Sequence, residues 1–408
     1  MRRAVHARAV HVIAVVVAVS ICPGNAIAQN WKFTPRLELG YLYNDNYRLD
    51  FSGNEIDVSG PFMDVVLPLQ LVDPIRKAEI APRVYGTYFP DERREDSNDY
   101  FLNGLFEQRT QRQVFGIRAS WSREDIVRSE LPSADVEGGL GDPTLGDPTL
   151  GDPTMGDAGR VLLRNERDLI RATPYWEYAL SQRHRIEAGA HYLDADFSNN
   201  YEDIQNDYTD YGLYAGWGWL LSQRTSITMR ARASQYETAF DSDGYGAELE
   251  WRSAVTETSE VYLRLGGQRT EIDRADASSH TSVIAGAGGR WVWPTANLFA
   301  DFTRTVGPTA SGAVVERNQL RLRLVRALQP RLSLVAGLRG TRDTAIDDSG
   351  FPSREYLTGE VGFDWRITRK WSLLVGYNYV WQEYSDEPSD RSSNAINLGI
   401  VYEPARGE

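Results

Sequence analysis

The stretch REYLTGEVGFDWRITRKWSLLVGYNYVWQEY, residues 354–384, shows the pattern that decides the fold. In 371–384, aromatic and aliphatic side chains occupy one set of alternate positions, beginning with Trp371, and smaller or polar residues predominate in the other. Alternation with a period of two places one side-chain set on each face of a β-strand. The same pattern fills 354–367, and the polar residues 368–370 between the two runs predict a tight turn. The stretch therefore predicts an antiparallel hairpin.

This unit recurs from Trp31 to Tyr402, and the breaks between runs alternate between short turns and longer, acidic loops. Strict alternation of short and long connections is typical of an up-and-down barrel whose two ends face different environments. The pattern predicts eighteen strands, or sixteen if the weak runs at 62–72 and 99–109 are not strands. The predicted strands are 31–43, 62–72, 76–88, 99–109, 113–123, 166–180, 184–197, 207–220, 225–237, 244–255, 259–271, 281–293, 296–306, 315–328, 331–342, 354–367, 371–384 and 392–402.

Two observations favour a transmembrane barrel, the all-β fold class that we predict, over a secreted or periplasmic β-protein, which would also alternate. Aromatic side chains cluster at strand ends, where a membrane interface is expected, as in Trp217, Trp219, Trp291 and Trp293. No run shows helical periodicity, and closure would remove the edges of so large a sheet. We expect short periplasmic turns, long external loops and, from the even strand count, two periplasmic termini.

The chain divides into a signal peptide at 1–28, a barrel at 29–403 and a tail at 404–408. The first segment has a basic start, an apolar run and a small-x-small site ending at Ala28. Cleavage would remove the single cysteine, so the mature chain could form no disulfide. Removing three arginines from the formal charge of −13 gives −16, which argues against a nucleic-acid partner.

The segment 124–165 differs from the rest because it contains three copies of Leu-Gly-Asp-Pro-Thr. Proline and glycine every fifth residue exclude a continuous strand or helix. We interpret it as a flexible external loop, with two alternatives left open: a lid that constricts the pore, or a weak cation site at Asp142, Asp147 and Asp152.

Strand parity predicts which charges line the lumen, because a charge facing lipid would cost about 2–4 kcal/mol near the midplane. A barrel this wide leaves an aqueous channel unless loops fill it. Arginines on its wall would attract anions, although they could instead pair with lumen acids and brace the barrel. Glycines such as Gly212 and Gly216 leave room beside them. The candidate selectivity residues are Arg171, Arg230, Arg232, Arg264, Arg290, Arg321, Arg323 and Arg339.

No catalytic or metal site is predicted. The mature chain has three histidines, and none has metal-ligand spacing. The pair His191 and Glu187, on one lumen face, comes nearest to a catalytic arrangement, and we interpret both as ordinary lumen residues. We therefore expect no enzyme activity and no cofactor.

Residues 31–41, with Pro35 and Tyr41, followed by Asn44-Asp45-Asn46 and the hydrophobic Leu49, resemble the start of outer-membrane β-barrel porins that are often encoded with exopolysaccharide loci. The resemblance covers this stretch, and the remaining hairpins share only the general pattern. It implies an outer-membrane barrel of a Gram-negative bacterium that passes polysaccharide. The sequence departs from this pattern at one point. Outer-membrane barrels commonly end on a terminal aromatic residue, whereas here 403–408 follow Tyr402 at the end of the last strand.

The sequence thus predicts an outer-membrane channel, or porin, that passes polysaccharide, oligosaccharide or small anions by passive diffusion. The alternative is a plugged barrel acting as a structural or adhesive surface protein. Expected partners are outer-membrane lipid and lipopolysaccharide, the outer-membrane assembly machinery and components of polysaccharide export.

Overall fold

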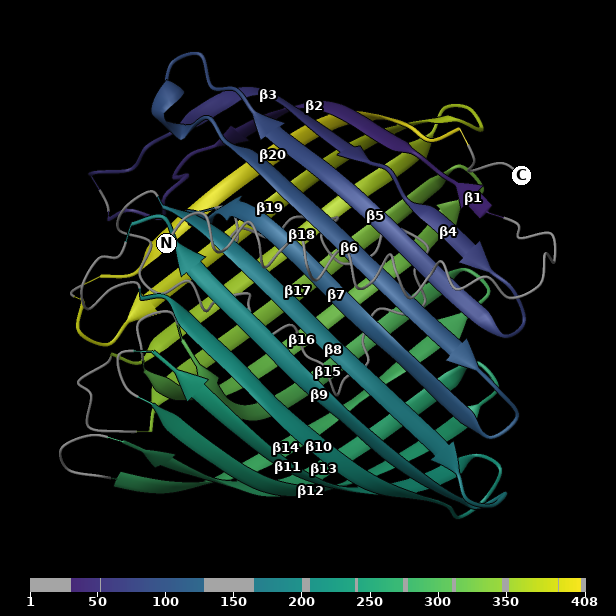
Figure 1. Cartoon of the computed structure of the whole chain (residues 1–408). Helices are drawn as coiled ribbons and strands as arrows, with labels where there is room; N and C mark the ends of the chain where they lie inside the picture. The colour runs from purple at the N-terminus through teal and green to yellow at the C-terminus, as the bar shows by residue number, and fades with distance from the viewer. Residues whose placement is uncertain are drawn as a thin grey trace.

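A single antiparallel sheet closes on itself to form a barrel (Figure 1). The computed structural model describes residues 31–51, 53–127, 165–199, 206–238, 241–273, 278–309, 313–346, 352–387 and 389–404. The barrel closes where β2 (Arg36–Asn44) pairs with β20 (Arg391–Tyr402), with Gly40 opposite Gly399. The predicted signal peptide and nearly all of the 124–165 loop lie outside the described residues.

In the described ranges, twenty strand segments make up the sheet, and one short 3-10 helix, η1 (Arg93–Glu95), follows β5. The strands are β1 (Trp31–Phe33), β2 (Arg36–Asn44), β3 (Val58–Val66), β4 (Leu69–Val72), β5 (Arg76–Thr87), β6 (Asn98–Arg109), β7 (Gln113–Asp125), β8 (Glu166–Ala179), β9 (His184–Phe197), β10 (Tyr208–Leu220), β11 (Thr225–Glu237), β12 (Ser242–Thr256), β13 (Ser259–Ile272), β14 (Ser278–Trp293), β15 (Ala296–Pro308), β16 (Val314–Gln329), β17 (Leu332–Ala345), β18 (Arg354–Arg366), β19 (Trp371–Tyr384) and β20 (Arg391–Tyr402).

These segments form eighteen strands across the barrel wall, as predicted. β1 and β2 together pair with β4 and β3, so each couple is one strand with a break. Proline stands at both breaks, as Pro35 and Pro68, and proline has no backbone N–H for the sheet ladder. The N–H of Thr34 donates to the carbonyl oxygen of Pro68 at 3.2 Å, which joins the two breaks.

Three predicted strand edges were wrong by three residues or more, and one of them is the end of the run predicted at 331–342, which continues to Ala345 in β17. The run predicted at 62–72 begins at Val58, because the ladder with β2 continues through Gly60 and Pro61, a pair that resembles a turn in the sequence. β14 begins at Ser278, three residues before the predicted start.

The short turns lie together at one end of the barrel, on the right of Figure 1, which we call the short-turn end. Hydroxyl side chains organise several of them. Ser181 Oγ accepts hydrogen bonds from the N–H groups of Arg183 and His184, each at 3.1 Å. Thr368 Oγ1 does the same for Trp371 at 3.1 Å. These local bonds favour a tight reversal, which explains why Ser and Thr begin the predicted turns. The opposite end is the long-loop end.

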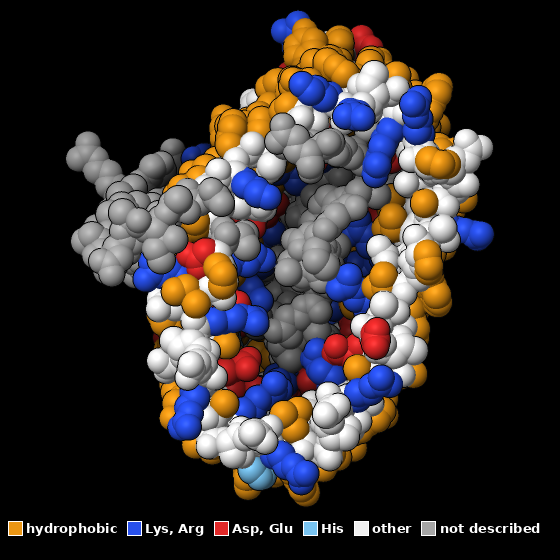
Figure 2. Space-filling model, turned by 90° about the vertical axis from the view of Figure 1, so that its right-hand side faces the viewer, with side chains coloured by type: hydrophobic (Ala, Val, Ile, Leu, Met, Phe, Trp, Pro, Cys, Tyr) orange, Lys and Arg blue, Asp and Glu red, His pale blue; other side chains and the backbone are white. Residues whose placement is uncertain are grey.

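The two faces of the wall differ as the alternation predicts. The outer face exposes large apolar side chains such as Leu265 and Met229, which are 65% and 60% exposed. Trp217 and Trp371 are also exposed, near the short-turn end. In Figure 2, the view from this end, hydrophobic side chains lie around the outside of the barrel, and Arg, Lys, Asp and Glu side chains lie on the inner side of the wall. No helix in the described ranges is long and apolar enough to cross a membrane.

Candidate functional site in the barrel lumen

The eight predicted selectivity arginines occupy inner-face positions in their strands. Each lies an even number of positions from a buried polar residue of the same strand, and therefore on the same face. Examples are Arg232 with Thr228 in β11 and Arg339 with Thr341 in β17. None belongs to the alternate set that carries the exposed apolar residues. The structure therefore brings these arginines to one surface, and their effect on selectivity stays a prediction.

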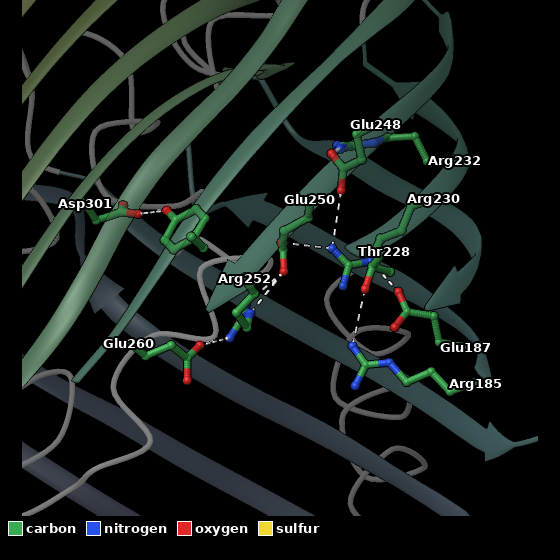
Figure 3. A network of polar contacts seen from close by, with 11 residues as sticks. Arg185, Glu187, Thr228, Arg230, Arg232, Glu248, Glu250, Arg252, Glu260 and Asp301 are labelled. Atoms are coloured by element: carbon green, nitrogen blue, oxygen red, sulfur yellow. Dashed lines mark hydrogen bonds and ion pairs between the residues drawn. The ribbon is translucent and has the colours of Figure 1, made fainter. Parts of the chain in front are cut away.

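Arg230 and Arg232 lie within a network of carboxylates on the inner wall (Figure 3). Arg230 forms ion pairs with Glu187 on β9 and, through Nη1, with Glu250 Oε2 at 3.2 Å and Glu248 Oε1 at 3.5 Å on β12. Arg232 pairs with Glu248. All three carboxylates are at least nine-tenths buried. Their charges neutralise the two arginines, so this part of the wall is braced by ion pairs, as the alternative interpretation expects.

A glycine allows the ion pair between Glu187 and Arg230, whose strands are not neighbours. Glu187 lies opposite Gly216 on β10, and Gly216 lies opposite Arg230 on β11. Glu187 must therefore reach across β10 to meet Arg230. A Cβ atom at residue 216 would lie 2.8 Å from Glu187 Cγ and Oε1, closer than van der Waals contact allows. Glycine at 216 thus permits an ion pair between strands that are not neighbours.

The same arrangement recurs at β13–β16. The hydroxyl of Tyr262 donates to Asp301 across Gly288, which lies between them in register. A Cβ atom at Gly288 would lie 2.7 Å from Tyr262 Cε1. Arg321 Nη2 binds the other oxygen of Asp301 at 2.8 Å. The buried carboxylate of Asp301 is therefore held from both sides.

The other predicted arginines are held differently. Arg339 donates to the side-chain oxygen of Gln319 through Nη2 at 2.8 Å, once the Gln319 amide is oriented to accept. Apart from Arg264, the remaining candidates, which lie on three separate strands of the inner face, are Arg171, Arg290 and Arg323.

A cavity of about 550 Å³ lies among inner-face residues of strands from β6 to β16. Three of the eight predicted arginines line it, namely Arg230, Arg232 and Arg264, and the other five do not. Tyr175, Tyr214 and Tyr236 also contribute to the lining. The wall of this cavity therefore combines cationic, anionic and aromatic groups, a mixture that can hold polar solutes.

The sequence interpretation missed an apolar cluster at the long-loop end, the mouth cluster. Its members come from both sides of the lumen, since β8 and β16 are eight strands apart in the wall of eighteen. Such a cluster narrows that end of the barrel. Its residues are Tyr47, Val58, Phe89, Ile126, Val127, Leu169, Leu193, Ala195, Phe197, Tyr208, Tyr236 and Val314.

The loop between β2 and β3 turns inward to supply Tyr47 and Leu49. Leu49 is buried against Tyr356 of β18 and Val380 of β19. Its φ of 55° lies in the left-handed region, which is strained for a leucine, so tertiary contacts must hold the loop in place. Arg391 contributes by donating to the Leu49 carbonyl oxygen at 3.3 Å.

The surroundings of this loop shift the pKa of two of its charged side chains, Arg48 and Asp50. Arg48 pairs with Glu95 of η1, and this hydrogen bond raises the pKa of Arg48. Burial raises the pKa of Asp50 above its ordinary 3.8, despite the favourable charges of Arg48 and Arg391. The ionised form of Asp50 therefore opposes the inward position of the loop, whereas the Arg48–Glu95 pair favours it.

The connection between β15 and β16 also reaches into the lumen. The hydroxyl of Tyr236 on β11 donates to the carbonyl oxygen of Thr309 at 2.8 Å, although four strand positions separate β11 from β15. Thr309 is 2% exposed. The bond therefore ties Thr309, next to the end of β15, to β11 across the strands between them.

The candidate catalytic pair is not formed. His191 Nε2 lies 3.3 Å from Asp210 Oδ1, and Glu187 is engaged by Arg230 instead. Ser234 lies on β11, two strands away across Gly212, and it forms no hydrogen bond with His191 among the described residues. Within the part of the chain that the structure describes, no group of three or more His, Cys, Asp or Glu residues could hold a metal ion.

The fold and site define a closed eighteen-stranded barrel with an apolar exterior and a charged lumen. No protein-family model matches the chain, and no curated protein is significantly similar to it. Among solved structures, *Pseudomonas aeruginosa* OccK2 (OpdF) is similar, with 11% identity, a TM-score of 0.46, and coverage of 92% of this chain and 98% of that chain.

Two further barrels are similar to a comparable degree. *Acinetobacter baumannii* OccAB1 shares 9% identity with a TM-score of 0.45, over 92% of this chain and 97% of that one. The FrpB iron transporter from *Neisseria meningitidis* shares 8% identity with a TM-score of 0.45, over 92% and 83%.

Proposed function

We propose that this chain is an outer-membrane channel that passes polysaccharide, oligosaccharide or small anionic solutes by passive diffusion. The observation that carries the proposal is the closed barrel with an exposed apolar outer face and a charged inner face around a cavity of about 550 Å³. Apolar surface of this extent is stable in lipid, and a polar lumen of this width can hold water and solute.

The orientation that we propose places the short turns and both termini in the periplasm. The eight short turns hold six basic and two acidic residues, whereas acidic residues predominate in the long loops. Anionic solutes would therefore be concentrated at the periplasmic mouth and repelled by the outer loops, while their concentration gradient sets the direction of net passage. The proposed partners are outer-membrane lipid with lipopolysaccharide, the assembly machinery that inserts barrels, and components of polysaccharide export.

The mouth cluster supports a second candidate function, a plugged barrel with a structural or adhesive role. The cluster fills part of the long-loop end with buried apolar side chains, which would oppose the passage of polar solutes. The two candidates differ in one property, since only the channel must let solutes through.

Proteoliposome swelling separates the two functions. Vesicles that contain the folded barrel are placed in isosmotic solutions of neutral and carboxylated sugars, from monosaccharides to pentasaccharides. We expect swelling that slows as the sugars lengthen. An absence of swelling with every sugar, in vesicles whose barrel is folded, would refute the channel and favour the plugged barrel.

A further inference from the structure

We infer that the lumen holds a binding site for a carboxylated oligosaccharide, built around Arg264 and Arg118. This inference rests on the proposed channel function, because the sugar must be able to enter the lumen. Both arginines line the cavity, Arg118 from β7 and Arg264 from β13.

Arg264 is buried and has no anionic partner among the described residues. It is 6% exposed, and its Nε atom makes no hydrogen bond. The residue opposite it on β12 is Glu250, which would be the natural partner. Glu250 is already occupied, because Oε1 binds Arg252 at 3.1 Å and Oε2 binds Arg230 at 3.2 Å. The nearby carboxylate on β12 therefore does not neutralise Arg264.

The other neighbour of Arg264 provides space rather than charge. Arg264 lies opposite Gly286 on β14. A Cβ atom at Gly286 would lie 3.2 Å from Arg264 Nε and 3.4 Å from Nη2, so the guanidinium lies directly over this glycine. The next carboxylate along the wall, Asp301, is held by Tyr262 and Arg321. The guanidinium is therefore fixed in position without an ion pair.

A buried guanidinium without an anion is unfavourable, so Arg264 should attract an anion from the solution in the lumen. The planar fork of arginine matches the two oxygens of a carboxylate. Arg118 supplies a second cationic group, which has no carboxylate partner among the described residues and whose Cζ lies 5.3 Å from the centroid of the Tyr175 ring.

The cavity is larger than a simple anion requires. At about 550 Å³ it falls in the range of pockets that hold small organic ligands. Three tyrosines contribute rings and hydroxyls to the lining, namely Tyr175, Tyr214 and Tyr236. Rings of this kind pack against sugar faces, and a tyrosine hydroxyl that already donates within the protein, as that of Tyr175 does to Glu107, can still accept a hydrogen bond from a sugar hydroxyl. The combination of free guanidinium groups and tyrosines points to an acidic sugar chain with carboxylates at both cationic positions.

Calorimetric titration of the folded, detergent-solubilised barrel tests this site. The probes are trigalacturonate, neutral maltotriose of the same length, and acetate as a simple carboxylate. The variants are Arg264→Gln and Arg118→Gln. The control is Arg342→Gln, which removes one positive charge from an outer-face side chain that is 65% exposed.

We expect trigalacturonate to bind more tightly than either other probe. Arg264→Gln should raise its Kd by at least about tenfold, the usual effect of losing a charge-assisted hydrogen bond, and Arg342→Gln should leave it unchanged. Arg118→Gln should also raise the Kd, and it tests the site even if Arg264→Gln fails to fold. Equal binding of maltotriose would refute charge recognition, and equal binding of acetate would refute the sugar. An equal loss with Arg342→Gln would reveal only general electrostatics and overturn the inference. If vesicles swell but trigalacturonate does not bind, the site is wrong and the channel stands.

Discussion

Replacing Gly216 with alanine should separate two ion-paired residues that lie on either side of β10. The new Cβ would lie 2.8 Å from Glu187 Cγ and Oε1 and 3.0 Å from the carbonyl oxygen of Met229. Because the backbone oxygen is fixed in the ladder, the Glu187 side chain must move away from Arg230. Arg230 would keep Glu248 and Glu250, so its charge would not be left without a partner.

The expected loss follows from these contacts. A hydrogen bond between charged groups contributes about 1.5–3 kcal/mol, and replacing a strand glycine with alanine recovers roughly 0.5–1 kcal/mol. Gly216→Ala should therefore lower the free energy of unfolding by about 1–2 kcal/mol. The matched control is Gly267→Ala on the outer face of β13, where the nearest atom to a new Cβ is 3.8 Å away. That variant should be as stable as the parent or slightly more stable.

Urea unfolding of the reconstituted barrel, followed by tryptophan fluorescence, measures both variants. The substitution should cost little in a Glu187→Gln background, because the ion pair that it disrupts is already weakened. If Gly216→Ala proves as stable as Gly267→Ala, or costs the same with and without Glu187, the structural reason for glycine at 216 is wrong.

Three further predictions concern single side chains. Arg230→Ala leaves Glu187 and Glu250 without their shared cation, so it should destabilise the barrel by about 3–5 kcal/mol and shift the reversal potential towards cations; an unchanged potential would contradict a role in selectivity. Tyr262→Phe removes one donor from Asp301 while Arg321 remains, so unfolding in urea should show a loss of about 1–3 kcal/mol, and no loss would mean that the bond contributes nothing. Burial raises the pKa of Asp50, so the folded loop binds a proton more readily than the unfolded chain does; its stability should increase as the pH falls from neutrality through that raised pKa, above the ordinary 3.8. Single-channel records should show fewer openings at acid pH, Asp50→Asn should reproduce this at neutral pH, and equal opening by variant and parent would refute the assignment.

The sequence predicts the barrel well because its wall depends on local pattern. Alternation assigns each strand residue to a face, and turn residues such as Ser181 and Thr368 determine where the chain reverses. The eighteen strands and the inner-face arginines follow from these rules. The strand edge at Val58 does not, because Gly60 and Pro61 resemble a turn and only pairing with β2 keeps them in the ladder.

The partners of the lumen charges could not be predicted in the same way. Parity places Glu187 and Arg230 on one face, but their contact depends on the register of three strands and on Gly216 between them. The pair of His191 with Glu187 was considered because parity places both on one lumen face, and the register instead brings His191 to Asp210. Register becomes visible only when the sheet is assembled.

The mouth cluster was missed for a different reason. Tyr47, Phe89 and Tyr236 are aromatic residues near strand ends, so the sequence pattern suggests a membrane interface. Their inward position depends on contacts across the lumen, such as the bond between Tyr236 and Thr309, residues 73 positions apart. No local pattern predicts contacts of this range.

Single-channel conductance in planar bilayers tests the channel most directly. The parent barrel should show discrete conductance steps. Tyr236→Ala removes a buried ring of the mouth cluster and its bond to Thr309, so it should increase the conductance or the open time. The control Tyr245→Ala, on the outer face and 54% exposed in the parent, should behave like the parent. Silence in the parent and in Tyr236→Ala, with both barrels folded and inserted, would contradict the channel.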